Sequence, residues 1–218
     1  MKNASEEYAV IKAPTVSNPF LPEGYVEQIL DNYDPVLADM YLNGEIVSLS
    51  SNKVYHFFDR RKHHTTRKLQ DSDKYLHVSI DFNIGGCCSV INIIENNRPI
   101  SVAEIISHDT RDFCNRLSEF AANGRKITVY PDASGKAGST NATSSDIDII
   151  RSGGYSVDCP KANPAVRDRI NAVNGLLSHD RWLINTDTCQ NLTDALESQG
   201  YDKAGQPEKF SEHPAIRS

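Results

Sequence analysis

The 218-residue sequence lacks any apolar run of about 18 residues, the length that a membrane span requires. Its first segment, MKNASEEYAV, has no continuous apolar stretch, so no secretory signal is expected. The five cysteines lack metal-site spacing, and an odd number of thiols suits a reducing compartment. Cys87 and Cys88, adjacent in a predicted hairpin, are interpreted as small core residues rather than a redox pair. These absences predict a cytoplasmic protein without a membrane anchor or a disulfide framework.

An excess of positive charge is also missing. The sequence has 23 Lys and Arg against 29 Asp and Glu, a formal net charge of −6. This balance argues against a protein that coats nucleic acid electrostatically, although it permits an enzyme that grips nucleic acid locally. With 24% charged and 39% hydrophobic residues, the composition is that of an ordinary globular protein. The length suits one full domain with a sizeable core, plus an extension.

The chain divides into two parts. Residues 1–72 are rich in Pro, Asn, Asp and Tyr, and one helix is expected there, over 23–42. Pro22 stands near the start of this helix and Gly44 at its end. Because apolar residues are few and irregular in this part, we expect an irregular and helical extension that packs on something else. Residues 73–218 carry the regular patterns of a domain.

From Lys74 onward the hydrophobic pattern predicts alternating secondary structure. Strands are expected at 75–82, 87–95, 99–107, 126–132, 155–158 and 181–185. Helices are expected at 110–123, 144–152, 165–177 and 188–199. Three antiparallel strands followed by alternating helices and strands indicate an α/β fold, a ribonuclease H-like mixed sheet with flanking helices. In that arrangement the first and fourth strands are neighbours.

An aspartate interrupts the strand that is expected to be central, in the stretch VSIDFNIGG. Asp81 stands between Ile80 and Phe82, where strand propensity and burial favour Val or Ile. Asp132 ends the fourth predicted strand, KITVYPD, in a similar way. Because the axes of neighbouring strands lie about 4.8 Å apart, the two carboxylates can share a divalent cation.

The pair of carboxylates predicts a chemistry. Aspartate oxygens suit Mg²⁺ or Mn²⁺, hard ions that keep several water ligands. Two such ions about 3.5–4 Å apart activate a water and stabilise the leaving oxygen in phosphodiester hydrolysis. Asp81 and Asp132 are therefore candidate metal ligands and catalytic residues. For Asp81 alone, a hydrogen-bonded turn carboxylate is the simpler interpretation.

Five basic residues are candidates for contact with a DNA backbone. They are Arg60, Arg61, Lys62, Arg167 and Arg169. For the first three the alternative is a solvated linker, and for the last two it is surface ion pairing with Asp168 or Asp180. The paired histidines after Lys62 do not predict zinc, because no Cys or second His pair lies at ligand spacing.

A rival fold shares part of this pattern. Sugar kinases and actin-like ATPases also open with an aspartate before a Gly-containing hairpin, and DASGKAGST resembles a phosphate loop. That fold usually needs two such domains and a much longer chain. The segment GKAGST does not match G-x-x-x-x-G-K-[ST], so no P-loop is present. The metal phosphodiesterase is the favoured interpretation.

Several segments, in this order and spacing, resemble the large terminase subunit of tailed bacteriophages, which cuts and packages viral DNA. They are APTVSNPFLPEGYVEQI, YDPVLADMYLNGEIV, KVYHFFDR, LHVSIDFNIGG, TVYPDASGKAGSTNATSSDIDIIRSGGYSV, NPAVRDRINAVNGLL and YDKAGQPEKFSEHP. The first three resemble the segment that leaves the packaging ATPase domain, and the others resemble the nuclease domain. The resemblance thus implies that residues 1–72 are the tail of the ATPase domain with a linker. Residues 73–218 would then be a ribonuclease H-like nuclease domain, truncated at its end.

The resemblance implies an endonuclease that cleaves concatemeric double-stranded viral DNA with two Mg²⁺ or Mn²⁺ ions, held by Asp81 and Asp132. The implied partners are viral DNA, the small terminase subunit and the portal protein, in the cytoplasm of a bacterial host. A third acidic ligand is expected on a helix beyond Ser218, and neither Asp202 nor Glu212 occupies its position. Two alternatives are a catalytically impaired prophage remnant that only binds DNA or docks, and a recombination nuclease of the same fold.

Overall fold

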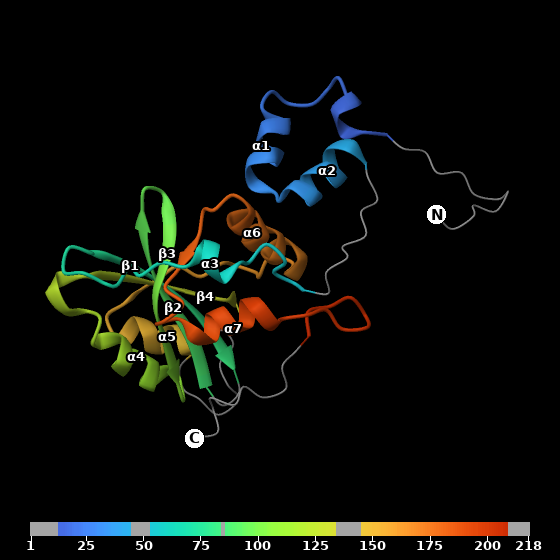
Figure 1. Ribbon diagram of the computed structural model, residues 1–218. Helices are drawn as coiled ribbons and strands as arrows, with labels where there is room; N and C mark the ends of the chain where they lie inside the picture. Colours follow the sequence, from blue (N-terminus) through green and yellow to red (C-terminus); the bar gives the residue numbers. More distant parts are fainter. Residues whose placement is uncertain (1–12, 45–52, 84–85, 134–144, 209–218) are drawn as a thin grey trace.

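A six-stranded mixed sheet forms the framework of the molecule (Figure 1). The computed structural model describes residues 13–44, 53–83, 86–133 and 145–208. Across the sheet, the strands are β5 (Ser156–Val157), β4 (Lys126–Pro131), β1 (Tyr75–Asn83), β2 (Gly86–Glu95), β3 (Arg98–Ser107) and β6 (Leu183–Ile184). The predicted strands are all present, with slightly different ends.

Helices flank the sheet and form a separate pair near the amino end. The α-helices are α1 (Tyr25–Asn32), α2 (Pro35–Asn43), α3 (Arg60–His63), α4 (Thr110–Ser118), α5 (Asp146–Ser152), α6 (Val166–Ser178) and α7 (Gln190–Ser198). Two short 3₁₀ helices are η1 (Thr15–Ser17) and η2 (Ala122–Gly124). In the part of the chain that the structure describes, no helix combines the length and the apolar character needed to cross a membrane.

The strand order confirms the predicted topology. β1, β2 and β3 form an antiparallel meander, and β4 then pairs parallel to β1. Asn96 and Asn97 connect β2 to β3 with positive φ angles of 51° and 59°, the backbone that a two-residue type I′ turn requires. The predicted Gly-Gly turn between β1 and β2 lies partly outside the described residues. The first and fourth strands are neighbours, as the sequence pattern predicts.

The main core lies on one face of the sheet. Alternate residues of β1 (Leu76, Val78 and Ile80) point into this face and are almost fully buried. They belong to one cluster with side chains of α4 and α5, including Phe113 and Ile150. Figure 1 shows α4 and α5 next to each other beside the sheet. The hydrophobic positions that predicted these strands therefore form the core.

The carboxyl-terminal helices build a second, smaller core. Ile184, Cys189 and Leu196 are buried there, with Tyr55 and Phe58 packed against them. The segment before β1 is anchored in the same region through His63, whose side chain has no exposed surface. The Nε2 atom of His63 lies 3.0 Å from the carbonyl oxygen of Leu177 on α6. Residues 53–72 thus pack on the domain that follows them.

The single helix predicted over 23–42 is wrong, because the chain forms two helices there. α1 ends at Asn32, and Asp34 caps the start of α2, where its side chain accepts a hydrogen bond from the Leu37 backbone N–H at 2.9 Å. Pro35 follows as the first residue of α2, where its missing N–H costs nothing. The Asp-Pro sequence is thus the start signal of a new helix. Gly44 ends α2 in the left-handed conformation, as predicted.

The helix predicted over 110–123 is also shorter than expected. α4 ends at Ser118, and the chain continues through a turn into η2. Asn123 in η2 has a φ of 62°, which no α-helical residue adopts. Gly124, the next residue, has a φ of 68° where the chain turns toward β4.

The helical pair α1–α2 docks on α6 through backbone atoms. Three carbonyl groups at the end of α1 meet α6 and the turn after it: those of Leu30, Asp31 and Asn32. The first accepts from His179 Nε2 at 3.0 Å and the second from Arg181 Nη1 at 3.1 Å. The third lies directly over Gly175, where an added Cβ would come within 2.3 Å of the carbonyl oxygen. The two hydrogen bonds satisfy carbonyl groups that a helix end leaves without intrahelical partners, and the third carbonyl group packs on Gly175.

We therefore expect Gly175→Ala to loosen the docking of α1 on α6. The added methyl group would overpack the contact, a change that typically costs about 1–3 kcal/mol. Helix propensity opposes this by up to about 1 kcal/mol. Hydrogen exchange of the α1 amides should become faster, and denaturant unfolding measures the net stability.

The control is Ala172→Gly at an exposed position of the same helix, which reports the Ala–Gly propensity difference without the contact. Unchanged exchange in α1 of the Gly175→Ala protein would show that the α1 carbonyl group does not pack on this glycine.

Candidate metal centre

The carboxyl ends of β1 and β4 bring the two predicted aspartates to the same edge of the sheet. The parallel register pairs Ile80 with Pro131 at the end of the shared ladder. Asp81 and Asp132 directly follow this last pair: Asp81 is still within β1, and Asp132 is the first residue after β4. The two aspartates thus follow the last pair of two adjacent strands, whose axes lie about 4.8 Å apart.

Asp81 lies on the sheet face opposite the α4–α5 core, and Asp132 lies just past the end of β4. Ile80 is buried in that core, and Asp81, which follows it, is exposed on the other face. Pro131 is buried in the same way, and Asp132 after it is half-buried. Asp81 also pairs across the sheet with Cys88 of β2. The two aspartates therefore lie at the same end of two neighbouring strands.

Asp132 has a close neighbour that the sequence analysis missed. The side-chain Oδ1 of Asn163 accepts a hydrogen bond from the Ala133 backbone N–H at 2.7 Å. Its Nδ2 donates to Oδ2 of Asp132 at 3.4 Å. The thiol of Cys159 lies 3.6 Å from the Asp132 carbonyl oxygen and donates to it. The loop between β5 and α6 thus binds both polar groups of the Asp132–Ala133 peptide and the Asp132 carboxylate.

The negative charge of Asp81 affects the neighbouring thiol of Cys88. Burial raises the pKa of the Cys88 thiol, and the carboxylates of Asp81 and Glu104 raise it further. Glu104 is fixed at the start of α7, where its two oxygens accept from the backbone N–H groups of Asn191 and Leu192 at 2.8 and 3.1 Å. Asp81 and Glu104 therefore both lie near Cys88, and the Glu104 carboxylate is already bound by backbone N–H groups of α7.

The donor set fits a hard divalent ion with an incomplete protein shell. Mg²⁺ is usually bound through one or two carboxylates, with water in its other positions. Among residues 13–44, 53–83, 86–133 and 145–208, no three His, Cys, Asp or Glu side chains are grouped to hold a metal ion. Asp202 accepts instead from the Ala204 and Gln206 N–H groups of its own turn. Glu212 lies outside the described residues.

The basic residues of α3 are engaged within the protein. Arg60 forms ion pairs with two carboxylates of α7 at 3.1 and 3.2 Å. Lys62 pairs with Asp180 at 2.7 Å. Arg61 is exposed, and its backbone N–H is bound by the Asp59 side chain that caps α3. The segment is a short helix docked on α6 and α7 rather than a solvated linker.

Arg167 and Arg169 are exposed in the first turn of α6. The Nη2 atom of Arg167 donates to the hydroxyl group of Tyr41 on α2 at 3.4 Å. Asp180, one of the two predicted ion-pair partners of these arginines, pairs instead with Lys62. Arg167 thus lies on the side of α6 that meets the helical pair, whereas Arg169, two residues further on, projects from a different side of the helix.

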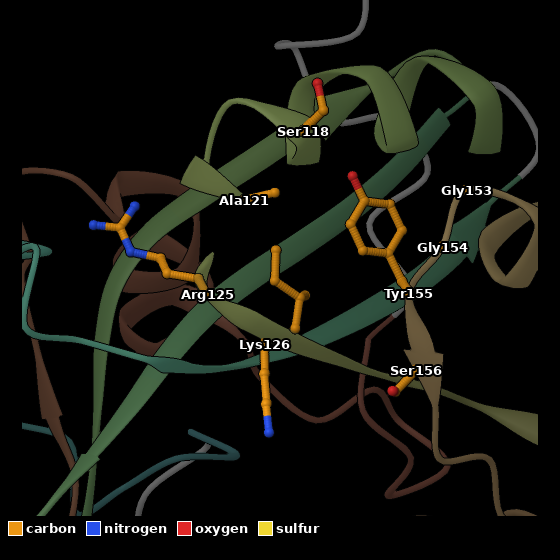
Figure 2. A pocket seen from close by; sticks show the side chains of 9 residues that line it. Ser118, Ala121, Arg125, Lys126, Gly153, Gly154, Tyr155 and Ser156 are labelled. Atoms are coloured by element: carbon orange, nitrogen blue, oxygen red, sulfur yellow. The ribbon is translucent and has the colours of Figure 1, made fainter. Parts of the chain in front are cut away.

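A cavity of about 520 Å³ lies at the opposite end of β4 from Asp132 (Figure 2). Its lining includes Arg125, Lys126 and Tyr155. The Arg125 guanidinium group donates to three backbone carbonyl groups, those of Gln70, Asp73 and Phe120. Because its donors are used in this way, Arg125 fixes the start of β4 and is not available to hold a ligand. This cavity is not part of the candidate metal centre.

Comparison with known families and structures supplies independent findings. The model of the terminase RNase H-like domain matches residues 86–214. The large terminase of the thermophilic bacteriophage D6E superposes with a TM-score of 0.67 over 89% of this chain, at 19% sequence identity. This chain covers 50% of that protein, so it spans half the length of this relative. No curated protein matches the sequence.

An isolated nuclease domain gives a similar result. The large terminase nuclease of the thermophilic phage G20c, solved with bound magnesium, superposes with a TM-score of 0.54 at 12% identity. The alignment covers 77% of this chain and 94% of that domain. The same nuclease with bound cobalt gives a TM-score of 0.52. At these identities the superpositions establish a shared fold.

Because Asp81 pairs with Cys88 across β1 and β2, we expect Asp81 to affect the reactivity of the Cys88 thiol. Asp81→Asn removes a negative charge near Cys88, which lowers the pKa of the thiol and favours its reactive thiolate form. Alkylation of Cys88 by iodoacetamide at mildly alkaline pH should become about two- to three-fold faster. Peptide mass spectrometry would follow the rate at each cysteine.

Cys114 is the internal control, because burial and the Cys87 thiol, not Asp81, raise its pKa. An unchanged alkylation rate at Cys88 would mean that the Asp81 carboxylate does not face this part of the sheet.

Proposed function

The chain belongs to the family of terminase RNase H-like domains, and we propose that it is the nuclease part of a large terminase. In this role it cleaves concatemeric double-stranded viral DNA during genome packaging, by metal-dependent phosphodiester hydrolysis with two divalent ions. The observation that carries the proposal is the parallel pairing of β1 and β4, whose last pair is Ile80 and Pro131, the residues directly before Asp81 and Asp132.

Asp81 and Asp132 would hold Mg²⁺ or Mn²⁺ at this edge. The bound ions supply an activated water and stabilise negative charge on the leaving oxygen. The protein's part is to fix the two carboxylates on rigid strands, so that attacking and leaving groups are oriented before reaction. The magnesium and cobalt in the G20c nuclease structures support the use of divalent ions by this fold.

The partners follow from the family. We propose that the substrate is double-stranded viral DNA and that the small terminase subunit and the portal protein act with the enzyme in the cytoplasm of a bacterial host. The superposition of 89% of this chain on the D6E large terminase supports a terminase rather than a recombination nuclease. We also keep the predicted division, with residues 1–72 as ATPase tail and linker and 73–218 as nuclease domain.

A second function remains open for the same fold. The described residues offer two carboxylates and no third ligand in a metal-binding group. This observation favours a prophage remnant with impaired catalysis, which would act only as a DNA-binding or docking module. Nicking of supercoiled plasmid DNA by the purified chain in Mn²⁺ separates the two functions.

The first test of the site is substitution of either aspartate. Asp81→Asn or Asp132→Asn replaces a metal ligand by a neutral isostere, so Mn²⁺-dependent plasmid cleavage should fall by at least about 100-fold. The melting temperature without metal should stay equal or rise slightly, because two crowded carboxylates lose their mutual repulsion.

Asp71→Asn is the matched control, since this aspartate is exposed and lies on the loop before β1. If either site variant cuts DNA as fast as the parent in Mn²⁺, the active site is elsewhere.

The second test concerns the arginines of α6. If Arg167 and Arg169 contact phosphates, changing both to Ala should weaken binding equally for all sequences. The slope of log K against log salt should become shallower by about 1–2, since each phosphate contact contributes about 0.9. Fluorescence titration of a labelled duplex at several salt concentrations measures the slope.

Arg116→Ala is the control, because Arg116 pairs with Asp112 within α4 on the other side of the sheet. A slope equal to that of the parent would exclude phosphate contacts at Arg167 and Arg169.

A further inference from the structure

Asn163 connects the end of β4 to the loop that follows β5. Its side chain contacts two adjacent residues, the backbone N–H of Ala133 and the carboxylate of Asp132, at 2.7 and 3.4 Å. A planar amide carries an acceptor and a donor side by side, so it can bind an N–H group and a carboxylate at the same time. The side chain therefore spans the point where the chain leaves the sheet.

The chemistry of the two contacts fixes the orientation of the amide. A backbone N–H can only donate, so the atom of Asn163 that faces Ala133 must be the oxygen. The nitrogen then faces Asp132, whose carboxylate, when ionised, can only accept. The flipped amide would oppose donor to donor at Ala133 and oxygen to oxygen at Asp132. Both partners thus require the same orientation.

The loop that carries Asn163 is itself anchored to β4. Asp158, directly after β5, donates its backbone N–H to the carbonyl oxygen of Val129 at 2.9 Å. Cys159 donates its thiol to the carbonyl oxygen of Asp132. Pro164 follows Asn163 and restricts its backbone to extended conformations. Asn163 is therefore presented to Asp132 by a segment with few alternative conformations.

We propose that Asn163 is a positioning residue that holds the Asp132 carboxylate in the orientation needed to bind a divalent ion. The proposal rests on the function proposed above and deepens it. Carboxylates that bind metals are themselves oriented by hydrogen bonds, and loss of such a partner typically lowers metal affinity by about 10- to 100-fold. The amide donor of Asn163 would play this part for Asp132.

Asn163→Ala removes both contacts and should weaken Mn²⁺ binding by roughly 10-fold in calorimetry. The Mn²⁺ concentration that gives half-maximal plasmid cleavage should rise by a similar factor, while the rate at saturating Mn²⁺ changes less. Asn43→Ala is the matched control, because it removes an exposed Asn–Asp hydrogen bond of 2.6 Å in α2, to Asp39. This control should leave Mn²⁺ binding unchanged.

Asn163→Asp separates positioning of the carboxylate from support of the loop. It keeps an acceptor for the Ala133 N–H but places a second carboxylate against Asp132. The melting temperature without metal should fall, and the rise in melting temperature on adding Mn²⁺ should be larger than in the parent. Both effects should disappear when Asp132→Asn is combined with Asn163→Asp, because the facing charge is then absent.

The possible outcomes are distinct. If Asn163→Ala binds Mn²⁺ as the parent does, or Asn163→Asp has the parent's melting temperature and Mn²⁺ response, Asn163 only supports the loop and the positioning role is wrong. If the parent neither binds Mn²⁺ nor cuts DNA, the proposed nuclease fails. In that case the melting temperatures of Asn163→Asp, with and without Asp132→Asn, still show whether the side chains at positions 163 and 132 are in contact.

Discussion

β1 and β4 run side by side in the same direction, and their register determines where the other features of the molecule lie. The pairing runs from Tyr75 opposite Lys126 to Ile80 opposite Pro131. It buries every second side chain of both strands under α4 and α5, and it leaves the alternate positions on the other face. A slip of one residue would bury Asp81 and expose Ile80. The same hydrophobic contacts that stabilise the fold therefore keep the two aspartates together.

The strands around Asp81 could be predicted from the sequence because the patterns that indicate them lie within a few consecutive residues. Alternation of Val78 and Ile80 predicts the strand, and the carboxylate that follows stands out against that pattern. The adjacency of the first and fourth strands follows from the succession of hairpins and helices. The break at Asp34 and Pro35 was equally local. It was missed because the apolar residues on either side were assigned to one continuous helix.

Other features depend on contacts between distant residues. Asn163 lies 31 positions from Asp132 in the sequence, and an Asn-Pro pair in a loop carries no sign of its partner. The basic cluster of α3 gives no local sign that two acidic residues of α7 lie beside Arg60. The shortened α4 likewise reflects the turn that the chain must make to enter β4. Local patterns could not predict these features because each is determined by tertiary packing.

The attachment of the α1–α2 pair to α6 has a mechanical consequence. α2 touches the first turn of α6 through Tyr41 and Arg167, while the end of α1 rests on Gly175 and His179 near its last turn. The 13 residues of α6 span about 20 Å. Two attachments this far apart resist swivelling, because rotation about one of them must break the other. A force applied to the helical pair is thus transmitted through α6 to the segment before β1, which contacts α6 through His63.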